Sequence, residues 1–189
     1  MNKYISGLIL AGGRSRRFGS DKAAHDIGGQ AMIARAFDAL SAVTDDVIVS
    51  VRYKDQRYEL DAEHVADRYR GLGPLAGLDA GFRRTRHDWV FVLACDLPQI
   101  SRSDIRRIAA HCTPDAEAVV AIDHDDRPQP LCACYYRPAA ERHVKQLLQR
   151  RHLSMMGLLQ RLDVVSVPLS EEALVNVNRR ADLKMLSLL

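Results

Sequence analysis

The chain alternates short, nearly continuous apolar runs with longer segments in which apolar residues recur every three to four positions. The first pattern is typical of buried strands and the second of amphipathic helices. The expected strands cover residues 4–11, 46–51, 64–66, 89–95, 116–122, 131–136 and 163–167. The expected helices cover residues 30–42, 75–84, 103–111, 139–149, 154–162 and 181–188. Strands that alternate with helices in this way predict a parallel sheet with crossover helices.

Residues 89–95 form the most apolar of these runs, as expected of a central strand that is covered on both faces. The helix expected at 103–111 follows Ser101 and Asp104, whose spacing indicates a helix start with a capping carboxylate. The whole pattern predicts a three-layer α/β fold, in which helices cover both faces of a mostly parallel, twisted sheet.

One segment, residues 123–130, interrupts the alternation with an acidic run and two prolines, Pro128 and Pro130. Proline has no backbone N–H, so the segment is expected to be neither a helix nor a central strand. Because it joins two expected strands, we expect a hairpin-like excursion over one edge of the sheet. This excursion would be either a solvated loop or a contact for substrate.

The length of 189 residues suits one domain with a single substantial core, so residues 1–189 are expected to form one domain. A hydrophobic content of 47% and a charged content of 27% are ordinary for a soluble globular protein. No apolar run approaches a membrane span, and the N-terminus lacks the layout of a signal peptide, so cytoplasmic residence is expected. The net charge of +3 and the scattered arginine pairs do not favour nucleic-acid binding.

The strongest functional pattern is LILAGGRSRRFGSDK at residues 8–22. Gly12 and Gly13 allow backbone amides to approach an anion, while the arginines and Lys22 supply cationic donors for phosphate oxygens. The loop is longer than usual strand-to-helix connections and follows the carboxyl end of a strand, where open α/β sheets bind ligands. We therefore expect a polyphosphate site. Lys22 follows Asp21 rather than glycine, which excludes a P-loop, and the lack of Gly-x-Gly-x-x-Gly argues against a dinucleotide-binding dehydrogenase.

Asp96 is the second strong candidate, because it follows the buried run directly and precedes Leu97 and Pro98. Its carboxylate is expected to point from the carboxyl edge of the sheet into the same crevice as the glycine loop. Magnesium (Mg2+) takes few protein carboxylates and completes its shell with water and phosphate oxygens, so one aspartate facing a triphosphate is sufficient. Ser101 is the better candidate for the helix cap, which favours a functional Asp96.

Two weaker patterns complete the candidate site. Gly73 and Pro74 lead into a helix whose first N–H groups would face a ligand, and Asp67 would accept hydrogen bonds from a base edge or balance neighbouring arginines. Near the end of the chain, Asn176 and Asn178 share one face of an alternating segment. A helix cap is an alternative explanation for Asn178 alone.

The order of these motifs is recognisable. Leu-Ala-Gly-Gly-x-Ser-x-Arg-x-Gly-x-Asp-Lys, then Gly-Pro-Leu-Ala-Gly, Cys-Asp-x-Pro and Asn-x-Asn together resemble the molybdenum cofactor guanylyltransferase family, from Leu10 to Leu183. The resemblance implies a Rossmann-like fold of the nucleotide-diphospho-sugar transferase type. It implies that GMP passes from GTP to the terminal phosphate of molybdopterin, giving the guanine dinucleotide form of the cofactor and pyrophosphate.

The same resemblance assigns roles to individual residues. It implies a nucleotide site at Leu10, Ala11, Gly12, Gly13, Arg14, Ser15, Lys22, Ser50, Asp67, Gly73, Pro74 and Asp96. It implies catalytic roles for Arg17, Lys22 and Asp96, with Mg2+ on Asp96, and an acceptor site at Pro130, Asn176 and Asn178. The nucleotide half would cover about residues 1–100 and the acceptor half about 101–189. Transient contacts with cofactor-insertion proteins and recipient molybdoenzymes would follow.

The chain departs from the family pattern at a few positions. Ser50 stands where relatives often carry asparagine, Phe18 replaces a methionine, and Arg179 and Arg180 replace a Thr-Pro pair. Two alternatives therefore stay open. The first is a cytidylyl- or sugar-phosphate nucleotidyltransferase of the same fold, although the double glycine resembles the guanylyl branch. The second is a noncatalytic GTP-binding regulator, against which the intact Lys22 and Asp96 argue.

Overall fold

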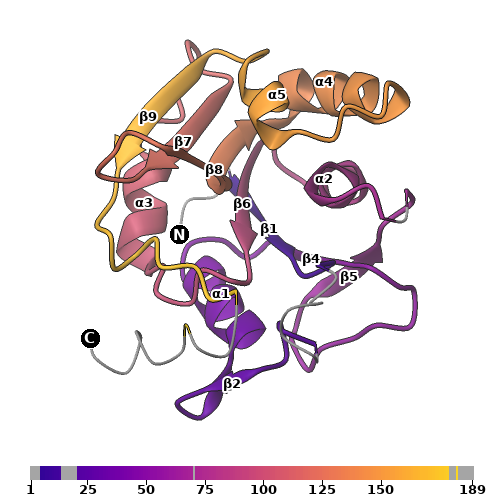
Figure 1. Cartoon of the computed structure of the whole chain (residues 1–189), viewed down its shortest axis with the longest axis vertical. Helices are drawn as coiled ribbons and strands as arrows, with labels where there is room; N and C mark the ends of the chain where they lie inside the picture. The colour runs from indigo at the N-terminus through magenta and orange to yellow at the C-terminus, as the bar shows by residue number, and fades with distance from the viewer. Residues whose placement is uncertain (1–4, 14–20, 70, 179–181, 183–189) are drawn as a thin grey trace.

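A seven-stranded sheet forms the centre of the molecule in a computed structural model that describes residues 5–13, 21–69, 71–178 and 182 (Figure 1). The strands follow one another across the sheet in the order β5-β4-β1-β6-β8-β7-β9. Their bounds are β1 Ile5–Leu10, β4 Val47–Val51, β5 Glu63–Ala66, β6 Trp89–Ala94, β7 Ala118–Ile122, β8 Pro128–Tyr136 and β9 Val164–Pro168. A separate two-stranded ribbon pairs β2 (Asp26–Ile27) with β3 (Gln30–Ala31).

The sheet is mostly parallel, as the alternation of strands and helices predicts. β1 lies parallel to both β4 and β6, β4 is parallel to β5, and β7 is parallel to β9. β8 is the exception, since it runs antiparallel to both of its neighbours, β6 and β7. A short turn from β7 to β8 makes the two strands antiparallel, whereas the parallel pairs need long crossovers.

Helices cover both faces of the sheet, so the expected three-layer arrangement is confirmed (Figure 1). α1 (Met32–Ser41) and α3 (Arg102–Ala109) contribute to one hydrophobic core, while α2 (Pro74–Phe82), α4 (Arg137–Gln149) and α5 (Met155–Leu159) contribute to the other. α3 begins with the capping box that Ser101 and Asp104 predict. α1 begins at Met32 rather than at residue 30, because Gln30 and Ala31 pair with β2 instead.

The segment 123–130 corrects one sequence-based expectation. Residues 123–127 form the expected hairpin turn, but Pro128 and Pro130 belong to β8, which is an interior strand. The register between β8 and β6 ends at Cys132 and Leu93, and the register with β7 shifts between Val120 and Ala121. The prolines therefore lie where pairing with β6 is absent and pairing with β7 is irregular. Proline has no backbone N–H, and such positions do not need one. The helix expected at 181–188 lies outside the described residues except for Asp182.

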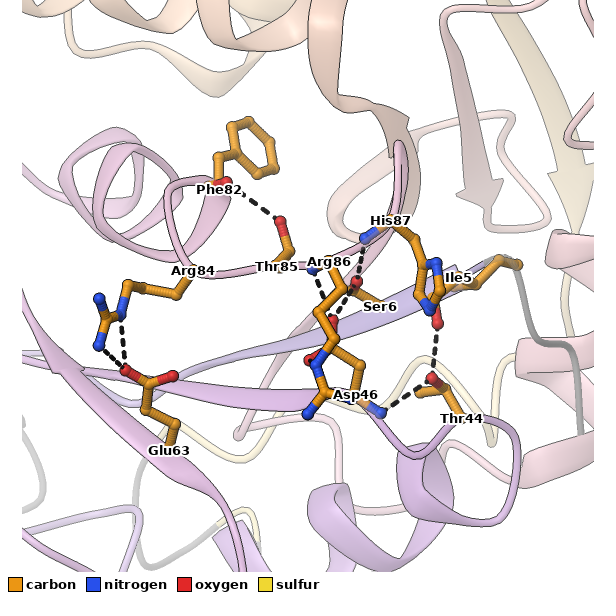
Figure 2. Close-up of polar contacts among 10 residues, drawn as sticks. All are labelled: Ile5, Ser6, Thr44, Asp46, Glu63, Phe82, Arg84, Thr85, Arg86 and His87. Atoms are coloured by element: carbon orange, nitrogen blue, oxygen red, sulfur yellow. Dashed lines mark hydrogen bonds and ion pairs between the residues drawn. The ribbon is translucent and has the colours of Figure 1, made fainter.

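A buried polar cluster fastens the amino-terminal edge of the sheet (Figure 2). The Asp46 carboxylate, only 3% exposed, accepts hydrogen bonds from the Ser6 hydroxyl and from the Arg86 N–H, at 2.8 Å for the latter. The His87 N–H donates to the Ser6 hydroxyl oxygen at 3.0 Å, and the Thr44 hydroxyl donates to the Ile5 carbonyl. These bonds join the loop after α2, which leads into β6, to the starts of β1 and β4. The parallel strands β1, β4 and β6 therefore begin in register.

We expect Asp46→Ala to lower the free energy of unfolding by about 2–3 kcal/mol, because the buried Ser6 hydroxyl and the partly buried Arg86 N–H would lose their acceptor. Urea denaturation of the variant and of Asp45→Ala, which removes the exposed carboxylate of the preceding residue, measures the difference. A loss below about 0.5 kcal/mol in Asp46→Ala, the size of an ordinary surface substitution, would contradict this role.

Candidate active site

The candidate site is a cavity of about 440 Å³ at the carboxyl ends of β1, β4 and β6. Leu10, the last residue of β1, pairs with Ser50 on β4 and with Ala94 on β6, so these three residues define the floor of the cavity. Eleven of the sequence-predicted site residues line it, namely Leu10, Ala11, Gly12, Gly13, Lys22, Ser50, Asp67, Gly73, Pro74, Asp96 and Asn178. Motifs from the whole length of the chain therefore meet at one edge of the sheet, as the strand-end rule predicts.

The remaining predicted residues are elsewhere or undescribed. Arg14, Ser15 and Arg17 lie outside the described residues. Pro130 and Asn176 do not line the cavity: the Pro130 carbonyl accepts the Tyr135 hydroxyl at 2.7 Å, and the exposed Asn176 amide donates to the Leu174 carbonyl at 3.4 Å. Their role with an acceptor stays a prediction.

Sequence reasoning missed several residues of the cavity wall. Arg52 follows the end of β4 by one position, and Gly77 belongs to the Gly-Pro-Leu-Ala-Gly motif, so both carried a usable signal. Cys95 directly precedes Asp96 and could have been found in the same way. Leu131 carried no signal, because its position depends on how β8 extends beyond β6.

Lys22 is held between two partners from distant parts of the chain. Its ammonium donates to the Asp96 carboxylate at 2.9 Å and to the Asn178 side-chain carbonyl at 2.9 Å. The Val177 N–H donates to the Asp96 carbonyl at 3.0 Å, which joins residues 177–178 to the end of β6. The lysine side chain is 13% exposed and the aspartate 26%, so the pair is partly shielded yet open to a ligand. The Asn178 side chain is thus directed to Lys22.

Asp67 lies at another part of the cavity wall, where β5 ends. Its carboxylate accepts the Ser50 hydroxyl at 3.0 Å. Burial raises the pKa of Asp67 to about 6, against the smaller opposing effects of the Ser50 hydrogen bond and the Arg52 charge. The group is therefore a carboxyl whose protonation changes near neutral pH, and it can either donate to or accept from a polar ligand edge.

Glycines let the walls of the cavity come together. A Cβ at Gly77 would lie 2.9 Å from both Leu10 Cδ2 and Ser50 Oγ, so α2 could not approach β1 and β4 as closely with any larger residue. Gly73 has a φ of 72°, which glycine adopts at low cost, and Pro74 starts α2 in the first-turn position that the sequence predicts. Gly13 lines the cavity as well, and no atom of the described residues beyond its chain neighbours lies within 4 Å of a Cβ built there.

Cys95 lines the cavity but is not suited to nucleophilic chemistry. Burial, followed by the neighbouring Asp96 charge, raises the pKa of the Cys95 thiol to about 12. The thiolate is the nucleophilic form of cysteine, so a thiol that stays protonated at neutral pH is inert. The polar groups of the site are therefore arranged for binding and for charge neutralisation.

The described part of the chain contains no cluster of three or more His, Cys, Asp or Glu side chains that could hold a metal ion. None of the helices within the described ranges has the length and apolar character that a membrane span requires.

The fold and this site define a nucleoside-triphosphate transferase. Residues 7–165 match the family model described as MobA-like NTP transferase domain. The chain is 33% identical over 169 residues to a probable molybdenum cofactor guanylyltransferase of Geobacillus sp. (strain WCH70), covering 87% of this chain and 85% of that one. It is 33% identical over 193 residues to the Bacillus subtilis (strain 168) counterpart, covering 97% and 94%. The chain belongs to the molybdenum cofactor guanylyltransferase family.

Solved structures agree on the fold. Molybdopterin-guanine dinucleotide biosynthesis protein A from Archaeoglobus fulgidus superimposes with a TM-score of 0.79 at 24% identity, over 97% of this chain and 100% of that one. The 2-C-methyl-D-erythritol 4-phosphate cytidylyltransferase from Thermus thermophilus gives 0.74 at 18% identity, over 98% of both chains. The expected nucleotide-diphospho-sugar transferase-like fold is thereby confirmed.

The pKa of Asp67 predicts a pH-dependent stability. Its value of about 6 in the folded protein lies above the ordinary 3.8, so between pH 4 and 6 the folded state holds more protons than the unfolded state. Stability should therefore fall as the pH rises through this window and stay reduced above it. Solvent screens this half-buried group, so we expect Asp67→Asn to raise the free energy of unfolding at pH 7.5 by at most about 2 kcal/mol.

Urea denaturation of the wild type and of Asp67→Asn at pH 4, 5, 6 and 7.5 tests this expectation. The difference between the two proteins should grow from pH 4 through pH 6 and level off by pH 7.5. Parallel stability curves at all four pH values would show that Asp67 is ionised with its ordinary pKa.

Proposed function

We propose that this chain transfers the GMP moiety of GTP to the terminal phosphate of molybdopterin, forming molybdopterin guanine dinucleotide and releasing pyrophosphate. Membership of the guanylyltransferase family supports the reaction. The single structural observation that supports it best is the Lys22–Asp96 pair beside a glycine-lined cavity at the carboxyl edge of the sheet. This arrangement offers a cation and a carboxylate to the same region of one bound polyphosphate.

The nucleotide would lie across the ends of β1, β4 and β6. The amides of Gly12 and Gly13 would approach the ribose and phosphates, and Asp67 would meet the guanine. Guanine presents neighbouring N–H donors. The Asp67 carboxylate accepts the Ser50 hydroxyl through only one of its oxygens, so it can accept further hydrogen bonds from the base. Arg14, Ser15 and Arg17 would wrap the triphosphate. The proposed nucleotide half covers about residues 1–100.

The reaction would be an in-line displacement at the α-phosphorus. An oxygen of the acceptor's terminal phosphate forms the new P–O bond, the bond from the α-phosphorus to the bridging oxygen breaks, and pyrophosphate leaves with that electron pair. The acceptor phosphate is already an anion, so no general base is required. Lys22 and Arg17 would neutralise the charge that develops on the phosphoryl oxygens, and alignment would supply much of the remaining acceleration.

Asp96 fits a magnesium site in which the substrate supplies part of the coordination shell. A hard divalent cation prefers oxygen ligands, and Mg2+ usually takes one or two carboxylates together with phosphate oxygens and water. Asp96 is a partly exposed carboxylate at the cavity wall, where triphosphate oxygens would complete such a shell. When bound, the ion would supply Lewis-acid polarisation of the phosphate groups.

The acceptor would approach from the side of residues 101–189. Asn178 reaches the cavity and Leu131 lines it, which supports an acceptor site formed with Pro130 and Asn176. Transient contacts with cofactor-insertion proteins and recipient molybdoenzymes in the cytoplasm would follow from the product's use.

The preference for guanine over other bases can be tested directly. Pyrophosphate release with molybdopterin should occur with GTP and Mg2+ and stay near background with CTP or UTP.

We expect Asp96→Asn to lower kcat to below about 1% of wild type, because the amide keeps the shape but loses the charge that holds a divalent ion. Pyrophosphate release with GTP, molybdopterin and Mg2+ is the measurement. Asp115→Asn removes an exposed carboxylate that precedes β7 at the other edge of the sheet and serves as the matched control. Near-normal turnover in folded Asp96→Asn would exclude the metal role.

We expect Lys22→Ala to lower kcat by about 100-fold, while the Kd for GTP changes by less than about threefold, because the ammonium acts on charge that develops during transfer. Steady-state rates and direct GTP titration separate these two effects. Lys145→Ala on α4 is the control. An unchanged kcat with much weaker binding would identify Lys22 as an anchor for ground-state GTP.

A further inference from the structure

The connection between β4 and β5, residues 52–62, lies against the loop that carries Lys22. Tyr58 in this connection is half-buried, and its side chain packs against the hydrophobic core that also contains Ala23. Its hydroxyl donates a hydrogen bond to the Asp21 carboxylate at 2.9 Å. Asp21 directly precedes Lys22, so a residue of the β4–β5 connection holds the side chain of the neighbour of Lys22.

Asp21 is held through both of its carboxylate oxygens. One oxygen accepts the Ala23 N–H at 3.1 Å, which closes a tight turn around Lys22. The other accepts the Tyr58 hydroxyl and, at 3.3 Å, the side-chain amide of Gln56. The same amide donates to the Tyr58 hydroxyl oxygen at 2.7 Å, so the three side chains form a closed cluster.

The cluster is itself fixed to the sheet. The Tyr58 N–H donates to His64 Nε2 at 3.2 Å, while His64 Nδ1 lies 2.9 Å from the Ala62 carbonyl, to which it donates in the neutral tautomer. Burial lowers the pKa of His64, which favours this neutral form. The Arg52 N–H donates to the Gln56 side-chain carbonyl at 3.1 Å. A continuous series of hydrogen bonds therefore runs from β5 to the residue before Lys22.

The Tyr58 hydroxyl is suited to this bond. Burial and the hydrogen bond to Asp21 both raise the pKa of Tyr58 above its ordinary value, so the phenol keeps its proton and remains a donor. A donor to a carboxylate makes a shorter and stronger bond than a neutral pair does. The bond thus joins the Asp21 turn to the β4–β5 connection.

We propose that Tyr58 is a positioning residue for Lys22, acting through Asp21 to hold the lysine ammonium at the cavity wall beside Asp96. The assignment rests on the proposed function, because it gives Lys22 a task that depends on exact placement. Lys22 reaches Asp96 and Asn178 at 2.9 Å each from a turn that the Asp21 carboxylate closes, and the His25 N–H donates to the Lys22 carbonyl at 3.1 Å on its other side. Small displacements of a group that acts on a transition state cost much more rate than binding.

Tyr58→Phe is the test, since it removes only the hydroxyl. We expect kcat for pyrophosphate release to fall about tenfold while the Kd for GTP stays within about threefold, because Lys22 is displaced rather than lost. Asp21→Ala should lower kcat at least as much, and adding Tyr58→Phe to Asp21→Ala should cause no further loss. Tyr136→Phe is the matched control, because Tyr136 pairs with Trp89 at the opposite end of β6.

A second readout does not depend on activity. Limited acylation with acetic anhydride, followed by mass spectrometry, measures the reactivity of Lys22 relative to the exposed Lys145 on α4, which lies outside the β4–β5 connection. Lys22 should react more in Tyr58→Phe than in the wild type or in Tyr136→Phe, since release from Asp96 frees its amine. Unchanged Lys22 reactivity, a kcat within twofold of wild type, or additive losses in the double variant would each overturn the proposal.

The two proposals can fail separately. If the wild type and Tyr136→Phe both release no pyrophosphate from GTP with molybdopterin, the proposed function is wrong. The acylation ratio would then still decide whether Tyr58 holds Lys22. If both of these proteins are active and Tyr58→Phe is equally active, the proposed function stands and the positioning role is overturned.

Discussion

The parallel pairing of β4, β1 and β6 is the constraint on which the rest of the molecule depends. Because the three strands run in one direction and in register, Leu10, Ser50 and Ala94 end side by side at one edge of the sheet. The residues that follow them in the chain, including Gly12, Arg52 and Asp96, are thereby placed around one cavity. The Asp46 cluster fixes the same strands at the opposite edge, so the position of the site is set by both ends of the sheet.

The site at the carboxyl ends of these strands contains two different electrostatic environments. At Asp67, burial raises the pKa of a carboxyl to about 6 despite the opposing hydrogen bond from Ser50, which suits recognition of a polar base. At Asp96, a carboxylate is neutralised by Lys22, whose ammonium is also held by Asn178. A nucleotide that spans the cavity would place its uncharged end in the first environment and its phosphates in the second. The ends of β4 and β1, with Ser50 and Leu10 on the cavity floor, lie between these two environments. Gly77 lets α2 approach both strands there.

The sequence predicted the parts of this arrangement that depend on local pattern. The apolar runs located seven strands of the main sheet, and the rule that ligands bind at carboxyl strand ends predicted that Gly12, Lys22 and Asp96 would meet at one place. The family resemblance added Asp67 to the same site. The alternation of residues 175–178 singled out Asn178, and the family resemblance gave it an acceptor role. Neither predicted its contact with Lys22, which spans 156 residues and follows from no local rule.

Long-range pairing explains what the sequence did not predict. Pro128 and Pro130 argued against a strand, yet they occupy β8 because its pairing with β6 ends at Cys132 and its register with β7 is irregular there. Tyr58 and Gln56 were not singled out, because a tyrosine in a polar connection has no signal until the connection is seen to lie against Asp21. Such contacts depend on where two loops meet in space, and a single sequence does not encode that in a short motif.

A crystal structure of the chain with GTP and magnesium tests the central claim most directly. The account predicts that guanine lies against Asp67, that the triphosphate crosses the amides of Gly12 and Gly13, and that Lys22 and a metal ion on Asp96 both contact the phosphates. A triphosphate bound away from the ends of β1 and β6, with Lys22 still paired to a metal-free Asp96, would contradict it.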